Sequence, residues 1–367
     1  MKKTFFITFF ACFFIFTSLC FPEALFSAGA DGVSLWFDKV LPSLFPFMVT
    51  CGLLYKLGIA AHIGNVFAPL MRPLFRLPGI AAFPLVLGVL SGYPMGAKIT
   101  AMLYEEKKIS LSDAEHILSF CNNPGPLFLA GTIGAVFLGN PYWGYTFLLC
   151  AFLGSLLTGI IYRFFKPVSK KERRTAYLSS NADPTSLADA LSYTIQSSMD
   201  TITQIGGYII LFNVIAQALA EVSFFTLINQ IFFFIPVSND FLQGFSGGIL
   251  EMTTGCHLLS QAADCTVLRL SAICFLVSFG GLSILSQTFG VLRNVPIRKG
   301  RYALCKICNA FFSTAFFCIL YPYFAEYVQK AVSASSLSTE TASSFSLLAY
   351  VLLAACIFTM LILKNKT

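Results

Sequence analysis

The sequence predicts an all-α polytopic membrane protein with about eight transmembrane helices and two re-entrant hairpins. Hydrophobic residues make up 56% of the chain and charged residues only 11%, whereas about a quarter of the residues in a soluble domain are charged. The mean hydropathy is +0.76. Apolar stretches of about 20 residues, long enough to cross a bilayer as a helix, recur along the chain. Because no long polar segment could fold separately, any binding site is expected within the bilayer or in short loops.

The N-terminus is expected to form an uncleaved transmembrane helix, and residues 1–30 are assigned to this segment. Lys2 and Lys3 precede an apolar run that ends at Phe21, and small residues follow at 27–30. This pattern also resembles a secretory signal peptide. The uncleaved helix is favoured because an apolar run of about 18 residues suffices to span a bilayer and exceeds a usual signal core.

Apolar stretches of spanning length set the expected transmembrane helices. They cover residues 4–21, 33–57, 113–138, 142–165, 188–220, 266–292, 302–322 and 344–363. Shorter connecting or interfacial helices are expected at 59–76 and 222–237. Ser112 and Glu115 are interpreted as a capping box, and Asp183 before Pro184 predicts another helix start.

Two further apolar stretches, 80–103 and 240–260, are interrupted by glycines and polar residues and are expected to be re-entrant hairpins. The first contains Ser91-Gly-Tyr-Pro-Met-Gly-Ala-Lys98 at its middle. Glycine permits a turn there, and proline prevents the helix from continuing. Basic loops favour the cytoplasmic side. All basic clusters lie inside only if the first hairpin enters from the cytoplasm and the second from outside, with both chain termini cytoplasmic.

The opposite orientation of the two hairpins predicts an inverted repeat. Each half runs through a helix, a short connector, a glycine-broken hairpin and a helix broken near its middle. Aligning Ser91-Gly92 with Ser246-Gly247 also aligns Gly125 with Gly280. The segments assigned from this plan are a first repeat at 31–165, a basic cytoplasmic linker at 166–186, a second repeat at 187–322, and a loop with a C-terminal transmembrane helix at 323–367.

The predicted helix breaks lie at Asn122-Asn-Pro-Gly-Pro126 and Ser278-Phe-Gly-Gly281. A break exposes backbone N–H and C=O groups, each of which costs several kcal/mol in lipid. Such breaks persist only where they are buried in protein or line a wet cavity. Inverted repeats with discontinuous helices are a recurring plan of secondary transporters.

The candidate solute-binding residues lie at or near the predicted tips and breaks. Lys98 and Glu251 are the ionisable groups nearest the tips, although they could instead reach the interface or pair with each other. Asn122 and Asn123 offer amide groups that suit a polar neutral solute, although they could equally cap the broken helix. The candidate set is Ser91, Gly92, Lys98, Asn122, Asn123, Gly125, Ser246, Gly247, Glu251, Thr253, Thr254, Ser278, Gly280 and Gln287.

No catalytic residue, metal site or cofactor is expected. Gly244 to Gly248 match GxSxG, but no strand precedes this motif, and His257 is the one histidine that follows it. The sequence has no HExxH, P-loop or dinucleotide fingerprint. Cys305 and Cys308 form a CxxC without a second pair. The basic run from Arg163 to Arg174 is interpreted as a cytoplasmic loop, so nucleic acid is not an expected partner.

Several motifs resemble one family. They are Gly32-Val-Ser-Leu-Trp36, Val40-Leu-Pro-Ser-Leu-Phe-Pro-Phe47, the Ser91–Lys98 stretch, Asn122-Asn-Pro-Gly-Pro-Leu-Phe128 with Gly131, and Glu251-Met-Thr-Thr-Gly255. The chain resembles the sporulation integral membrane protein YlbJ family, which carries the nucleoside-recognition, or Gate, domain. The resemblance implies a fold shared with concentrative nucleoside transporters and with the membrane part of ferrous-iron transporters. It also implies a spore-forming bacterial source, a role in sporulation and a central site formed by the tips and broken helices.

The function expected first is a membrane protein that binds or moves a small polar solute, such as a nucleoside or another metabolite. The alternative is a non-transporting membrane scaffold or sensor needed for spore formation. The expected location is the cytoplasmic membrane, and the expected partners are the lipid bilayer and a small polar solute. The sequence leaves a homo-oligomer open and names no coupling ion.

Overall fold

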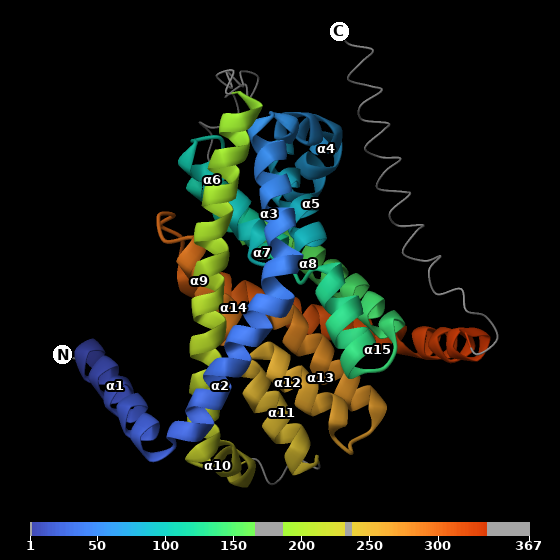
Figure 1. Cartoon of the computed structure of the whole chain (residues 1–367). Coiled ribbons are helices and arrows are strands. Elements are labelled where there is room, and N and C mark those ends of the chain that lie inside the picture. Colours follow the sequence, from blue (N-terminus) through green and yellow to red (C-terminus); the bar gives the residue numbers. More distant parts are fainter. Residues whose placement is uncertain (1, 166–185, 232–236, 336–367) are drawn as a thin grey trace. The chain divides into compact units, whose positions relative to one another are not determined.

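The computed structural model describes residues 2–165, 186–231 and 237–335, and this part of the chain contains helices and no strand (Figure 1). The chain divides into two units, residues 1–319 and 320–367. Helix α15 (Lys299–Ser335) runs from the first unit into the second. All side-chain contacts described below lie within the first unit. The expected helix at 344–363 lies outside the described residues.

Five helical stretches in the described part are long and apolar enough to cross a membrane. They are Pro22–Lys56, Pro141–Phe165, Leu187–Glu221, Thr266–Val291 and Lys299–Glu326. A sixth arises if Ile59–Phe75 and Gly79–Ser91, which meet at 92°, count as one span. The all-helical, multi-pass membrane class is therefore confirmed, with fewer spans in the described part than the eight expected for the whole chain.

The N-terminal region is more continuously helical than expected. α1 (Lys2–Cys20) is followed directly by α2 (Pro22–Ser34), a π-helical stretch at Leu35–Val40, and α3 (Leu41–Lys56). The expected start of a helix at residue 33 was wrong, because Pro22 begins the helix. Proline fits the first helical position, where its missing N–H would have no intrahelical acceptor.

The first half contains the predicted hairpin and the predicted broken helix. α4 (Ile59–Phe75) leads through a 3₁₀ turn at Gly79–Ala81 to α5 (Ala82–Ser91) and α6 (Met95–Glu105), which turn at Gly92. α7 (Leu111–Cys121) ends at Asn122, and the helical path resumes into a π-helical stretch at Phe128–Phe137. α8 (Pro141–Phe165) closes the half. The break expected at 122–126 is confirmed.

The second half follows the same order with different details. It contains α9 (Leu187–Glu221), α10 (Phe224–Ile231), α11 (Asn239–Leu250), α12 (Met252–Gln261), α13 (Thr266–Phe279), α14 (Gly281–Val291) and α15. α11 and α12 form the second hairpin and meet at Glu251. The break between α13 and α14 falls at Gly280, within the predicted Ser278–Gly281 segment.

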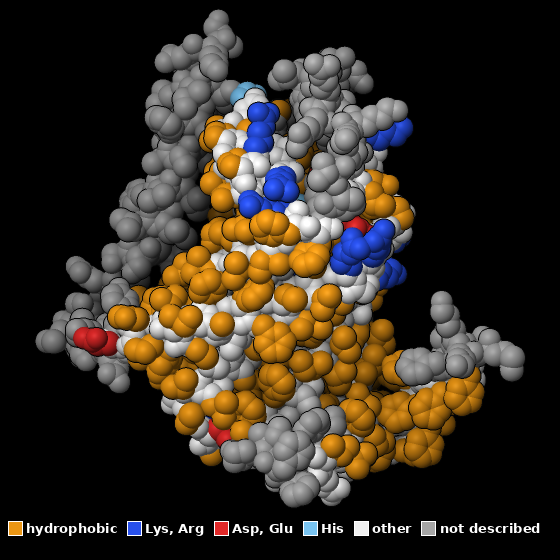
Figure 2. Space-filling model, turned by 180° about the vertical axis from the view of Figure 1, so that it is seen from behind, with side chains coloured by type: hydrophobic (Ala, Val, Ile, Leu, Met, Phe, Trp, Pro, Cys, Tyr) orange, Lys and Arg blue, Asp and Glu red, His pale blue; other side chains and the backbone are white. Residues whose placement is uncertain are grey.

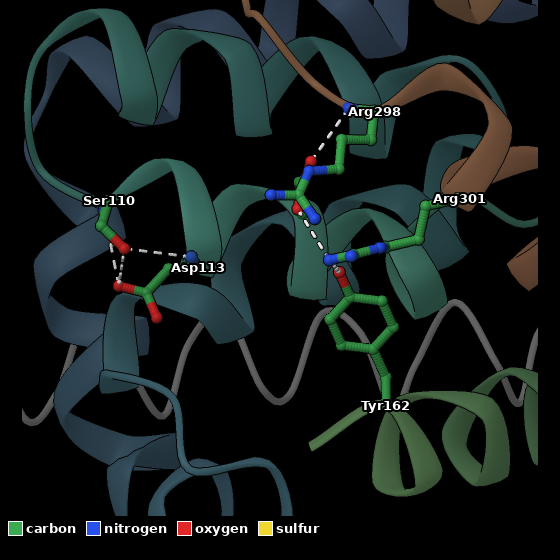
Figure 3. A network of polar contacts seen from close by, with 6 residues as sticks. Ser110, Asp113, Tyr162, Arg298 and Arg301 are labelled. Atoms are coloured by element: carbon green, nitrogen blue, oxygen red, sulfur yellow. Dashed lines mark hydrogen bonds and ion pairs between the residues drawn. The ribbon is translucent and has the colours of Figure 1, made fainter. Parts of the chain in front are cut away.

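The capping box lies two residues earlier in the chain than predicted. Ser110, not Ser112, caps α7: its Oγ accepts from the Asp113 N–H at 3.0 Å, and the Asp113 carboxylate accepts from the Ser110 N–H. Figure 3 shows this pair beside a second polar group. Glu115 accepts hydrogen bonds from the Arg298 N–H at 2.9 Å and from Arg301 at 3.4 Å. Its carboxylate therefore joins the two halves instead of capping its own helix.

Basic side chains gather at one end of the helices. Figure 2, which views the molecule from behind, shows Lys and Arg over the upper part of this face, whereas hydrophobic side chains cover most of the rest. Arg163, near the end of α8, donates to the carbonyl oxygens of Pro73 and Leu74, near the end of α4. Arg301 contacts both Glu115 and Tyr162 at 3.4 Å (Figure 3). The ends of α4 and α8 and the start of α15 thus share one basic polar layer.

Small residues let the first hairpin lie directly against the end of α7. A Cβ atom on Gly88 or on Gly96 would lie 2.2 Å from the Cys121 carbonyl oxygen. In the second half, a Cβ on Gly255 would lie 2.1 Å from Gly248 Cα, so α11 and α12 touch through their backbones. No larger side chain fits at these crossings without moving backbone.

Gly96→Ala is expected to lower stability, because the new methyl group meets a fixed carbonyl oxygen. Overpacking of this kind costs about 1–3 kcal/mol. The measurement is the thermal midpoint of the purified protein in detergent. Gly207→Ala is the matched control, since a Cβ there meets nothing within 4 Å and alanine favours a helix. Equal midpoints for the two variants would contradict the close packing of α6 on α7.

Glu106, at the end of α6, is expected to give a pH-dependent contribution to stability. Burial alone would raise the pKa of its carboxyl, but hydrogen bonds from Lys108 and Tyr55 hold that pKa below its usual value. The Tyr55 hydroxyl lies 2.5 Å and the Lys108 ammonium 2.8 Å from the carboxylate. A lowered pKa in the folded state stabilises the fold above the unfolded-state pKa, and the effect is lost as the pH falls through the folded-state pKa.

Glu106→Gln should therefore melt at a lower temperature than the unmodified protein at pH 7. The gap should close as the pH falls below about 4, the ordinary range for a glutamate carboxyl. Thermal midpoints between pH 3 and 8 check this expectation, and a gap that stays constant across the series would refute it.

Candidate functional site

The two hairpin tips meet in the interior of the first unit. Tyr93, at the first tip, donates its hydroxyl to Met252 Sδ, at the second tip, at 2.8 Å. Tyr93 is 8% and Met252 2% exposed. The tips are far apart in the sequence, so this contact joins the two halves of the chain.

Each tip also rests on the helix break of its own half. At the first tip Gly92 has φ of +85°, a conformation that glycine adopts readily, and a Cβ there would lie 2.6 Å from the Gly125 N–H nitrogen. A Cβ on Gly281 would lie 3.1 Å from the Gly248 carbonyl oxygen and 3.2 Å from that of Leu250. We call the four segments together the tip–break cluster: residues 91–95, 122–126, 250–252 and 279–281.

Asn122 links the first break to the second half of the chain. It is 1% exposed. Its Nδ2 donates to Thr288 Oγ1 at 3.1 Å and to the Tyr302 hydroxyl at 2.8 Å. Its Oδ1 is buried and accepts no hydrogen bond from the described residues. The side chain therefore holds two helices together and still presents a free acceptor.

Asn123, the next residue, uses both its amide nitrogen and its amide oxygen in hydrogen bonds within the protein. It is 2% exposed. Its Nδ2 donates to the Phe120 carbonyl at 2.8 Å and to Ser155 Oγ at 3.0 Å, and its Oδ1 accepts from Asn309 at 3.3 Å. These bonds tie the break to α8 and α15. The capping interpretation of the two asparagines fits Asn123 better than Asn122.

Lys306 is a central polar residue that the sequence reasoning missed. It lies on α15, it is 1% exposed, and its ammonium donates to the Asn122 carbonyl oxygen at 3.0 Å. Tyr302, Asn309 and Ser313 belong to the same helix and are also buried. An isolated lysine inside an apolar stretch is the sequence signal that could have identified it.

Glu251 caps the second hairpin helix. Its carboxylate accepts from the backbone N–H of Thr253 at 3.0 Å and of Thr254 at 2.7 Å, and the residue is 6% exposed. A carboxylate at a helix N-terminus satisfies free backbone donors and opposes the positive end of the helix dipole. Thr253 and Thr254 therefore contribute backbone groups here, and the Thr254 side chain is exposed.

Several candidate residues lie outside the tip–break cluster. Lys98 donates to the Ser197 carbonyl of α9 at 2.8 Å, in a pocket between α3, α6 and α9. Ser246 and Gly247 lie inside α11 rather than at its tip, and Ser246 donates back to the Leu242 carbonyl. The alignment of Ser246-Gly247 with the first tip was wrong, because the second hairpin turns at Glu251.

The remaining candidates flank the second break. Ser278 is fully buried on α13, and Gly280 adopts the left-handed conformation between α13 and α14. Gln287 is buried on α14 and donates to Ser283 on the same helix at 3.2 Å. Thr288, the next residue, is the one that contacts Asn122. Ser91 and Gly125, in contrast, lie within the cluster, where a Cβ on Gly125 would lie 3.0 Å from the Ser91 carbonyl oxygen.

The chain is similar to known proteins over most of its length. A family model described as "Nucleoside recognition", named Gate, matches residues 37–214. The sporulation integral membrane protein YlbJ of Bacillus subtilis (strain 168) is 30% identical over 371 aligned residues, which cover 92% of this chain and 90% of that protein. An uncharacterized protein of Alkalihalophilus pseudofirmus is 29% identical over 154 residues, covering 41% of this chain and 32% of that protein.

A solved structure of CNTnw in an outward-facing state is also similar. It covers 82% of this chain and 84% of that chain, with a TM-score of 0.48 and 13% sequence identity.

Glu251→Ala is expected to lower the free energy of unfolding by about 0.5–2 kcal/mol, the range for loss of a helix N-cap side chain. The effect follows from leaving the Thr253 and Thr254 N–H groups without their acceptor. Thermal midpoints in detergent measure it. Ser246→Ala is the control, since that hydroxyl only donates back to its own helix. A Glu251→Ala midpoint equal to the control's would contradict the capping role.

Proposed function

The chain belongs to the YlbJ family of sporulation integral membrane proteins, and we propose that it binds a small polar solute at the tip–break cluster and moves it across the cytoplasmic membrane. The observation that carries this proposal is that the two hairpin tips meet through Tyr93 and Met252 and that each tip packs on the helix break of its own half. Nucleoside-like molecules and other neutral metabolites have the donors and acceptors that such a site would recognise.

The chemistry of the cluster supports a neutral polar solute. Asn122 offers a buried Oδ1 without a partner, and an unsatisfied buried acceptor costs about 1–3 kcal/mol. A solute donor that reached this atom would remove that cost. Interrupted helices also leave backbone N–H and C=O groups at the break, which supply further polar contacts inside an apolar protein.

We further propose that both hairpins are re-entrant and have opposite orientations. α5 has 10 residues and α6 has 11, so each is about 15 Å long, half of the bilayer's apolar thickness. Placing the basic layer of α4, α8 and α15 in the cytoplasm satisfies the positive-inside rule. With this orientation we propose that both chain termini lie inside and that the two halves form an inverted repeat.

A non-transporting scaffold or sensor is the second candidate function. It is favoured by Asn123, whose amide nitrogen donates to Phe120 and Ser155 and whose Oδ1 accepts from Asn309, so that both ends of the amide are used within the protein. If Asn122 also serves only to join α7 to α14 and α15, the cluster is a structural junction. A solute-binding experiment separates the two functions.

The test is thermal unfolding of the detergent-purified protein against nucleosides, nucleobases, amino acids, dicarboxylates and divalent metal ions. A solute that binds only the folded state at a hundredfold excess over its Kd stabilises by about 2.7 kcal/mol. We expect one polar class to raise the midpoint, and Asn122→Ala to remove that rise.

Two variants control this experiment. Gln217→Ala removes an amide that donates to Glu221 on its own helix, outside the candidate residues, so it should keep the solute-dependent rise. Gly92→Leu should disrupt the first tip under either function, because glycine's backbone freedom is needed there. The absence of a rise for every class in the unmodified protein would favour the scaffold or sensor.

A further inference from the structure

Lys306 is a buried cation without an acidic partner among the described residues. Its side chain is 1% exposed, and its Nζ makes one hydrogen bond, to the Asn122 carbonyl oxygen at 3.0 Å. No carboxylate oxygen in the described part lies within ion-pair distance of this nitrogen. An unpaired buried charge is strongly unfavourable unless nearby groups compensate it.

The end of α7 supplies that compensation. α7 ends at Cys121, so its last carbonyl groups have no intrahelical partner and carry the negative end of the helix dipole. The carbonyl that Lys306 contacts belongs to Asn122, the first residue of the break. In membrane transporters, half-helix C-terminal ends and unwound backbone carbonyls are the groups that coordinate small cations.

A second observation points to the same kind of ligand. Asn122 Oδ1 is buried and accepts no hydrogen bond within the described chain. The Asn122 residue therefore presents two oxygen atoms at the break, one of them bound to an ammonium group and the other open. These two oxygen atoms are neutral and no carboxylate accompanies them, so a buried cation here has little negative charge to balance it, which favours a single positive charge over two.

We propose that the Lys306 ammonium is a tethered cation that occupies a monovalent cation site at the first helix break. The side chain takes the place of a dissociable ion and neutralises the exposed end of α7. For solute binding, which rests on the proposed function above, the consequence is independence from added sodium. The cation site itself is testable without any solute.

The test deletes most of the Lys306 side chain and then adds a free ammonium ion of the same size from solution. Lys306→Ala deletes three methylene groups and the ammonium, which together correspond to n-propylammonium. We expect Lys306→Ala to melt several degrees below the unmodified protein, and n-propylammonium to raise its midpoint in a saturable way. n-Propanol, which fills the same space without charge, should not raise it.

Lys98→Ala is the matched control. Lys98 also donates to a single backbone carbonyl, but that carbonyl belongs to Ser197, within the continuous helix α9. Neither this variant nor the unmodified protein should respond to n-propylammonium. An equal response in Lys98→Ala, an equal effect of n-propanol, or no response in a folded Lys306→Ala would each overturn the proposal.

Lys306→Met decides the matter if Lys306→Ala does not fold. Methionine keeps most of the side-chain volume and removes the charge. A clearly lower midpoint for Lys306→Met would support the tethered cation, since an ammonium with no favourable site is commonly replaced by an apolar residue without loss. An unchanged or higher midpoint would overturn it. These outcomes do not depend on finding a solute, so they stand apart from the test of the proposed function.

Discussion

The structure depends on one constraint: a helix interrupted among apolar residues must satisfy the backbone groups that the break exposes. Two helices break near their middles, at 122–126 and at Gly280. Each break lies against a hairpin tip, and the contacts are so close that Gly125 and Gly281 have no room for a Cβ without displacing backbone. The hairpins, the glycines and the buried amides therefore all serve to pack around the backbone N–H and C=O groups that the two breaks expose.

The two breaks are packed by different kinds of groups. The first uses side chains from the other half: Asn122 contacts Thr288 and Tyr302, and Asn123 contacts Asn309. The second is closed by backbone, where Gly281 approaches the carbonyl groups at the end of α11. α14 and α15 are consequently the elements that tie the first break to the second half. A movement of one half relative to the other would have to change these side-chain bonds.

The sequence predicted the features that local chemistry determines. Proline and glycine interrupt the helix at 122–126, and two consecutive glycines interrupt it at Gly280. Both breaks could therefore be predicted from the local sequence. The features that depend on distant partners were harder to see. Glu115 looked like a capping residue, yet it binds Arg298 and Arg301. Ser246 looked like a tip residue because of its glycine neighbours, although the turn falls at Glu251. Lys306 was overlooked because its role arises only once α15 lies against the end of α7.

Glu251 and Lys306 complete a pattern that bears on what the cluster can bind. Glu251 places a carboxylate at the N-terminus of α12, where the helix dipole is positive, and Lys306 places an ammonium at the C-terminus of α7, where it is negative. These two half-helix ends thus each meet an opposite charge from the protein itself. Neutralising these two ends weakens the local field that would attract an ion, and the Asn122 Oδ1 remains as an open amide oxygen. Under the function proposed above, the cluster would therefore favour a neutral solute that is selected by hydrogen bonds.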